Sequence, residues 1–214
     1  MSSSGVIVDV AAAVDAAAQG PVLVIGTGPP TTPDLRLLVP GSEVGAIADR
    51  LQADGFLRWR SRWARFDRGA VEGAQLVTAA AWGLAPDGAP GADELFTDAR
   101  LLPGCTHLAL PAPHVVLVLT AHELLLAHGR LGAEERASAV AAGAADGAWD
   151  DAAALAGRLR LSAALRLLRR ALDRPDPWTE QRRRREMVRA LATHPRSARR
   201  VVVTRQERPA VVRC

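Results

Sequence analysis

The hydrophobic pattern of the chain changes at Pro113, and this change constrains the fold more than any other feature of the sequence. Before Pro113, short apolar runs alternate with loops rich in glycine and proline, which indicates strands and turns. After it, apolar residues recur at helical spacing and no further proline occurs until Pro175, which indicates helices. We therefore expect an α+β fold. Its predicted parts are an α/β domain over residues 1–111, a helical domain over 112–174 and an arginine-rich tail over 175–214.

The N-terminal half is expected to combine helices with short strands. Spaced apolar positions predict helices over 6–18 and 43–53, the second with Ser42 as its N-cap, and a short helix over 93–98. Continuous or alternating apolar runs predict strands at 22–26, 34–39, 56–60, 63–68, 71–80 and 105–110, the last at a sheet edge. Tight connections favour antiparallel pairing of the runs between residues 56 and 80. The C-terminal half is predicted to form helices over 114–128, 133–143, 149–157 and 160–173.

Three aromatic residues, Trp59, Trp63 and Phe66, recur across two neighbouring predicted strands. We expect them to pack in the core, because large aromatic side chains dominate protein interiors. A hydrophobic site for an acceptor molecule at these residues is the alternative.

The positive charge of the chain is concentrated in its last part. Residues 174–214 hold 12 arginines against 4 acidic residues, whereas the rest of the chain is mildly acidic. The run Arg182–Arg185 could bind phosphate groups, but only Trp178 lies near it to stack on bases. We expect a solvated or partner-docking tail rather than a nucleic-acid module, with nucleic-acid binding through these arginines as the alternative.

Nothing in the sequence predicts a membrane span or a disulfide framework. No apolar stretch reaches 18 residues, and the N-terminus carries no basic segment of the kind that opens a secretory signal. The two cysteines are Cys105 and Cys214, and we expect Cys105 to be a buried, unreactive thiol. These features favour a cytoplasmic, reduced protein.

Residues 22–39 (VLVIGTGPPTTPDLRLLV) resemble the opening of the nucleotidyltransferase superfamily. The similarity spans roughly residues 5–173 and includes LQADGF at 51–56, Trp82 and the stretch that begins with LALPAPHVVLVL. More narrowly, the chain resembles a group of bacterial nucleotidyltransferases with a helical C-terminal half. The resemblance implies a mixed sheet with flanking helices. It also implies a small-residue turn for the triphosphate, two carboxylates at i and i+2 on one strand, and a third acid on a neighbouring strand. Alternate strand positions share a face, so such carboxylates can hold the Mg²⁺ ions of phosphoryl transfer.

The resemblance assigns each part of this site to a position of the chain. The turn Gly26-Thr27-Gly28 would contact the nucleotide, and Asp34 would be the first carboxylate. The second and third positions carry Arg36 and Gln75 instead of acids. A guanidinium beside Asp34 would pair with it and repel Mg²⁺. We therefore expect metal-dependent nucleotidyl transfer to be lost or very weak.

Other interpretations of these residues remain open. Glu72 or Asp67 could replace the missing ligands, although a bulge would be needed to turn Glu72 to the face of Gln75. Alternatively, the turn only ends a strand, Asp34 and Arg36 form an ordinary ion pair, and Gln75 is a polar residue facing solvent.

Four histidines recur through the middle of the chain, at His107, His114, His122 and His128. The last two are six residues apart, whereas zinc ligands on a helix lie three or four apart. We expect structural histidines rather than a metal site.

Three functions remain open for the chain. The first is a nucleotidyltransferase-like protein, degenerate for transfer, that binds a small molecule or a protein partner in a bacterial biosynthetic pathway. The second is an active enzyme that transfers NMP from an NTP, with Mg²⁺, to a small-molecule or protein acceptor. The third is a nucleotidyltransferase fold reused for metal-free biosynthetic chemistry, with Asp34, Arg36 and the histidines lining a remodelled pocket. The sequence leaves open whether the chain is an enzyme and which cofactor it uses.

Overall fold

The chain divides into two compact units, residues 1–112 and 113–214, which are described separately below. In the computed structural model, the described residues are 4–25, 34–59, 62–67, 70–85, 89, 91–127, 129–173, 185, 188 and 192. The turn Gly26-Thr27-Gly28 and most of the predicted tail lie outside them.

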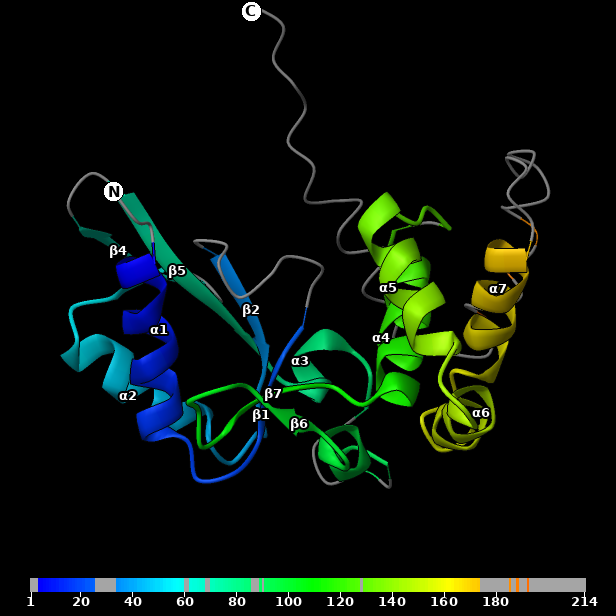
Figure 1. The fold of residues 1–214 in the computed structure, drawn as a ribbon, viewed down its shortest axis with the longest axis horizontal. Coiled ribbons are helices and arrows are strands. Elements are labelled where there is room, and N and C mark those ends of the chain that lie inside the picture. The colour runs from blue at the N-terminus through cyan, green and yellow to red at the C-terminus, as the bar shows by residue number, and fades with distance from the viewer. Residues whose placement is uncertain are drawn as a thin grey trace, which may run out of the picture. The chain divides into compact units, whose positions relative to one another are not determined.

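Unit 1 is built on a seven-stranded mixed sheet with the order β3-β4-β5-β2-β1-β7-β6 (Figure 1). The strands are β1 Val22–Val24, β2 Asp34–Leu38, β3 Leu57–Trp59, β4 Arg62–Asp67, β5 Ala70–Val77, β6 Arg100–Leu101 and β7 Leu108–Leu110. β2 pairs with β5 and β1 pairs with β7 in parallel, and the other neighbours are antiparallel. With the helical region that follows, this confirms the α+β fold with a mixed sheet.

Two helices, α1 (Ser4–Ala17) and α2 (Val44–Ala53), pack on the same face of this sheet (Figure 1). Val14 of α1 and Leu51 of α2 are buried against alternate strand residues such as Leu37 and Trp63. We call this the covered face. It holds the core because most strand residues that project to it, such as Leu35, Ala74 and Leu76, are apolar and exclude water.

Several predicted details of unit 1 are wrong. Glu43, not Ser42, is the N-cap of α2. β5 ends at Val77, because the Thr78 hydroxyl accepts a hydrogen bond from the amide of Ala81 (3.0 Å) and starts the short helix α3 (Ala79–Trp82).

The predicted edge strand near residue 105 is an internal strand. β7 lies between β1 and the two-residue strand β6, which has too few residues to be recognised by alternation. The predicted short helix near residue 93 is the single 3₁₀ turn η1 (Asp93–Phe96).

The three aromatic residues of β3 and β4 lie on different faces of the sheet. Trp63 is buried in the core, whereas Trp59 and Phe66 are 75% and 74% exposed. The expectation of core packing is therefore wrong for two of the three. The reason is strand alternation, since Trp63 lies on the covered face and the other two lie on the opposite one.

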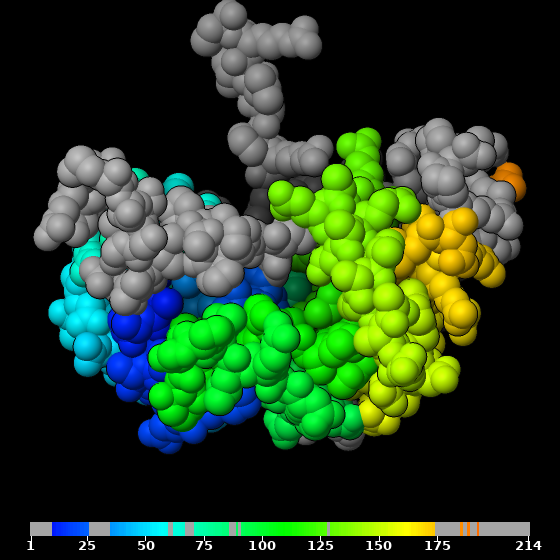
Figure 2. All heavy atoms as spheres, viewed as in Figure 1, coloured from blue at the N-terminus to red at the C-terminus, as the bar shows by residue number. Residues whose placement is uncertain are grey.

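Asp15 anchors α1 to the segment that leads into β7. Its carboxylate accepts hydrogen bonds from the backbone N–H groups of Thr106 (2.9 Å), His107 (2.7 Å) and Leu108 (2.8 Å). Partial burial by itself would raise the pKa of Asp15, but these hydrogen bonds and the nearby His107 outweigh it and hold the pKa below its ordinary value. Figure 2 shows the green atoms of this segment lying against the dark blue atoms of α1.

The helices described in unit 2 are α4 and three others that pack against it. The helices are α4 Pro113–Leu126, α5 Ala133–Gly143, α6 Ala148–Arg158 and α7 Ser162–Asp173. α4 packs against the other three and is apolar around most of its circumference, as expected for a central helix. A side-chain hydrogen bond from Arg136 Nη1 to the carbonyl oxygen of Ala171 (2.9 Å) joins α5 to α7. None of the helices in the described part of the chain has the length and apolar character needed to cross a bilayer.

Candidate functional site

The strand positions that the resemblance assigns to the site lie on β2 and β5, which are neighbours in the middle of the sheet. Their parallel register places Asp34 opposite Gly73 and Arg36 opposite Gln75. Laterally paired residues project to the same face of a sheet, so Arg36 and Gln75 share the face opposite the covered one, which we call the open face. The structure thus brings together two of the positions that the sequence assigned to the site.

Arg36 is held in a defined position on the open face. Its Nε donates a hydrogen bond to Oε1 of Gln75 (3.3 Å), and its guanidinium carbon lies 5.4 Å from the centre of the Trp82 ring. Trp82 is buried at the end of α3, which directly follows β5. An arginine fixed by an amide and an aromatic face is oriented before any ligand arrives.

The remaining residues assigned to this site are only partly described. The backbone N–H of Ile25 donates to the carbonyl oxygen of Arg36 (2.8 Å), and residues 26–28 lie outside the described residues. Asp34 is described as a strand residue and its side chain is not, so the proposed Asp34–Arg36 ion pair stays a prediction. Gln75 does not simply face solvent, because it is half-buried and accepts the Arg36 hydrogen bond.

The side chains described here do not fit an Mg²⁺ ion. A magnesium site requires oxygen ligands, usually with carboxylates among them. The second position presents a guanidinium, and the carbonyl oxygen of Gln75 at the third position accepts from that guanidinium. Among the described residues, no three His, Cys, Asp or Glu side chains gather into a metal-binding group.

Glu72 does not supply the missing ligand. Pairing of β4 with β5 is regular from Asp67–Ala70 to Arg62–Gln75, so no bulge turns Glu72 toward Gln75. Glu72 instead lies on the covered face, 2% exposed, with its Oε2 3.4 Å from Nη2 of Arg65. The side chain of Asp67, the other replacement, is not among those described.

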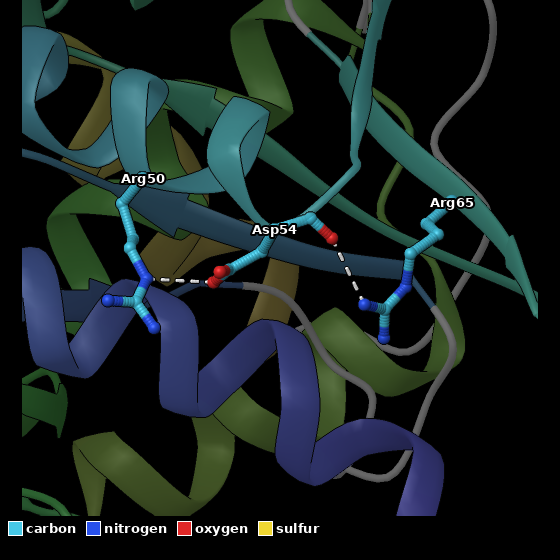
Figure 3. Close-up of polar contacts among 3 residues, drawn as sticks. All are labelled: Arg50, Asp54 and Arg65. Carbon is cyan, nitrogen blue, oxygen red and sulfur yellow. Dashed lines mark hydrogen bonds and ion pairs between the residues drawn. The ribbon is translucent and has the colours of Figure 1, made fainter.

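Arg65 of β4 contacts residues in three other parts of unit 1, namely β5, the end of α2 and Phe56. The sequence did not predict these contacts of Arg65. Besides contacting Glu72, its Nη1 donates to the backbone carbonyl of Asp54 at the end of α2 (3.1 Å), and its guanidinium lies 4.7 Å from the ring of Phe56. Figure 3 shows the Asp54 side chain also accepting a hydrogen bond from Arg50 Nε (2.8 Å). Strand alternation in the sequence places Arg65 and Phe66 on opposite faces of β4. It does not show which of these faces is covered.

The described histidines and Cys105 belong to no group of three or more residues that could hold a metal ion. His122 is completely buried in α4. His128 lies outside the described residues. Cys105 is half-buried and not buried as expected. Partial burial and the negative charge of Asp15 raise the pKa of its thiol, which disfavours the nucleophilic thiolate.

Comparison with family models, with curated proteins and with solved structures finds no match to this chain. The resemblance to nucleotidyltransferases therefore stays a prediction that rests on the sequence. The structure itself shows the mixed sheet and the hydrogen-bonded Arg36–Gln75 pair at its centre.

Proposed function

We propose that the chain is a nucleotidyltransferase-like binding protein of a bacterial biosynthetic pathway, which holds an anionic group of a ligand or partner at Arg36 instead of carrying out metal-dependent nucleotidyl transfer. The observation that carries this proposal is the Arg36–Gln75 hydrogen bond at the centre of the sheet. The guanidinium of Arg36 is a permanent positive charge at a position where the superfamily would hold a cation.

The chemistry of Arg36 favours an anion. A guanidinium is charged at every physiological pH and its planar set of N–H donors matches a carboxylate or a phosphate. Gln75 and Trp82 restrict its orientation, which lowers the entropy lost when an anion binds. The position of Glu72 on the covered face counts against the active-enzyme alternative, since that acid is not available to a metal on the open face.

Replacing both residues by carboxylates tests the mapping of the site. We expect Arg36→Asp combined with Gln75→Asp to bind Mg²⁺ at least roughly tenfold more tightly than the unaltered chain, because two added carboxylates on adjacent strands supply the oxygen ligands that Mg²⁺ needs. Calorimetric titration with MgCl₂ measures the change.

The matched control is Arg36→Asn combined with Gln75→Asn, which removes the guanidinium and adds no negative charge. It should leave Mg²⁺ affinity unchanged. If the two aspartates gain no more affinity than the two asparagines, positions 36 and 75 do not form one site with Asp34 and the mapping fails.

A further inference from the structure

On the open face of the sheet, the strands β3, β4 and β5 expose several large apolar side chains. Leu57 and Trp59 of β3 are 78% and 75% exposed, and Phe66 of β4 and Val71 of β5 are 74% and 58% exposed. Strand register places Phe66 directly opposite Val71, and Trp59 opposite Arg62. An exposed apolar patch of several contiguous side chains usually marks an interaction site.

This patch continues into the Arg36 site without interruption. Register pairs Trp59 with Arg62, Arg62 with Gln75 and Gln75 with Arg36, so one row of residues runs across β3, β4, β5 and β2 on the open face. The row alternates an aromatic ring and a polar amide with two arginines. By strand alternation Asp34 also occupies an open-face position of β2, and its side chain is not described; no other Asp or Glu among the described residues of these four strands lies on this face.

The composition of the face favours one class of partner. Exposed aromatic rings on a sheet, with arginines between them, suit bases that stack and phosphates that pair with guanidinium groups. Arg62 and Phe66 are four residues apart on β4, which is about 13 Å and gives room for a few bases stacked about 3.4 Å apart.

A second copy of the chain fits this face less well. In a two-fold contact the same patch meets itself, so Arg36 and Arg62 of both copies would be enclosed in one interface. Like charges brought together in this way oppose association. An apolar protein partner would make no use of the arginine row.

We propose that the open face of β3, β4, β5 and β2 binds single-stranded nucleic acid, with bases stacked on Trp59 and Phe66 and phosphates paired with Arg62 and Arg36. This inference rests on the proposed function and names the partner class, since the phosphates supply the anionic groups for Arg36. It concerns the sheet, not the arginine-rich tail from which the sequence raised nucleic-acid binding as an alternative.

Fluorescence anisotropy with the intact chain and labelled 12-nucleotide oligouridine and oligothymidine tests the proposal. We expect Trp59→Ala and Phe66→Ala each to weaken binding by at least roughly fivefold, because a stacked base contributes about 1–3 kcal/mol. Arg62→Gln should also weaken binding and reduce its dependence on salt. The matched controls are Val140→Ala and Arg166→Gln, exposed residues of unit 2, which should leave affinity within about twofold because they add nothing to the stacking face.

Three results would overturn the proposal. The first is no binding of either oligonucleotide by the unaltered chain. The second is binding that is lost only when Arg182–Arg185 are replaced by glutamine, which would assign it to the tail. The third is a dimer in analytical ultracentrifugation that Trp59→Ala dissociates, which would assign the face to a second copy. If oligonucleotides fail to bind while the double-aspartate variant gains Mg²⁺ affinity as expected, the partner class is wrong and the proposed function stands.

Discussion

Replacing Arg65 with methionine is expected to lower the free energy of unfolding by about 3–5 kcal/mol, because it removes the charge partner of a buried carboxylate. Glu72 is 2% exposed and its Oε2 lies 3.4 Å from Arg65 Nη2. The substitution also removes the hydrogen bond to the Asp54 carbonyl and the contact with the Phe56 ring. Unfolding in urea, followed by circular dichroism, measures the loss.

Two matched variants separate the buried charge from the loss of side-chain volume. Arg65→Met combined with Glu72→Met should recover most of the stability, since no uncompensated charge then remains in the core. Arg50→Met removes an exposed ion pair of the same helix end and should cost no more than about 0.5 kcal/mol. A single Arg65→Met variant as stable as Arg50→Met would show that Arg65 does not compensate Glu72.

Replacing Asp15 with alanine is expected to lower the free energy of unfolding by about 2–3 kcal/mol, because hydrogen bonds to a charged acceptor are stronger than neutral ones. The carboxylate accepts from three successive backbone N–H groups and joins α1 to the start of β7. Asp15→Asn keeps one acceptor oxygen without the charge and should lose less.

The effect of Asp15 should depend on pH in a defined direction. Its pKa is lower in the folded chain than in the unfolded chain, where an aspartate titrates near about 3.9. The stabilisation is therefore fully present above that pH and is lost as the pH falls through the folded pKa. The difference in unfolding free energy between the unaltered chain and Asp15→Asn should shrink as the pH is lowered from 6 to 3. A difference that is constant over this range would mean that the charge of Asp15 contributes nothing.

The sequence predicted the elements that depend on local periodicity. The four helices after Pro113 and the strands around Leu37 and Ala74 follow from spacing of apolar residues, which neighbouring residues determine. It also placed Arg36 and Gln75 on strands that could meet, and they are direct lateral partners.

The features that the sequence did not predict depend on which face of the sheet is covered. Alternation shows that Arg65 and Phe66 point to opposite sides, but only the packing of α1 and α2 decides which of them is buried. This is why the sequence does not predict the Arg65–Glu72 contact and why its pattern wrongly predicts core positions for Trp59 and Phe66. Residues 26–28, proposed to contact a nucleotide, lie outside the described residues, so that part of the site stays a prediction.

Calorimetric titration of the intact chain with ATP, GTP and CTP, each with and without Mg²⁺, tests the proposed loss of metal-dependent transfer most directly. With Arg36 bonded to Gln75 at the centre of the sheet, we expect that Mg²⁺ does not strengthen the binding of any of the three nucleotides. Tight binding that requires Mg²⁺ would contradict the proposal, because it would show that a metal site exists despite the guanidinium at position 36.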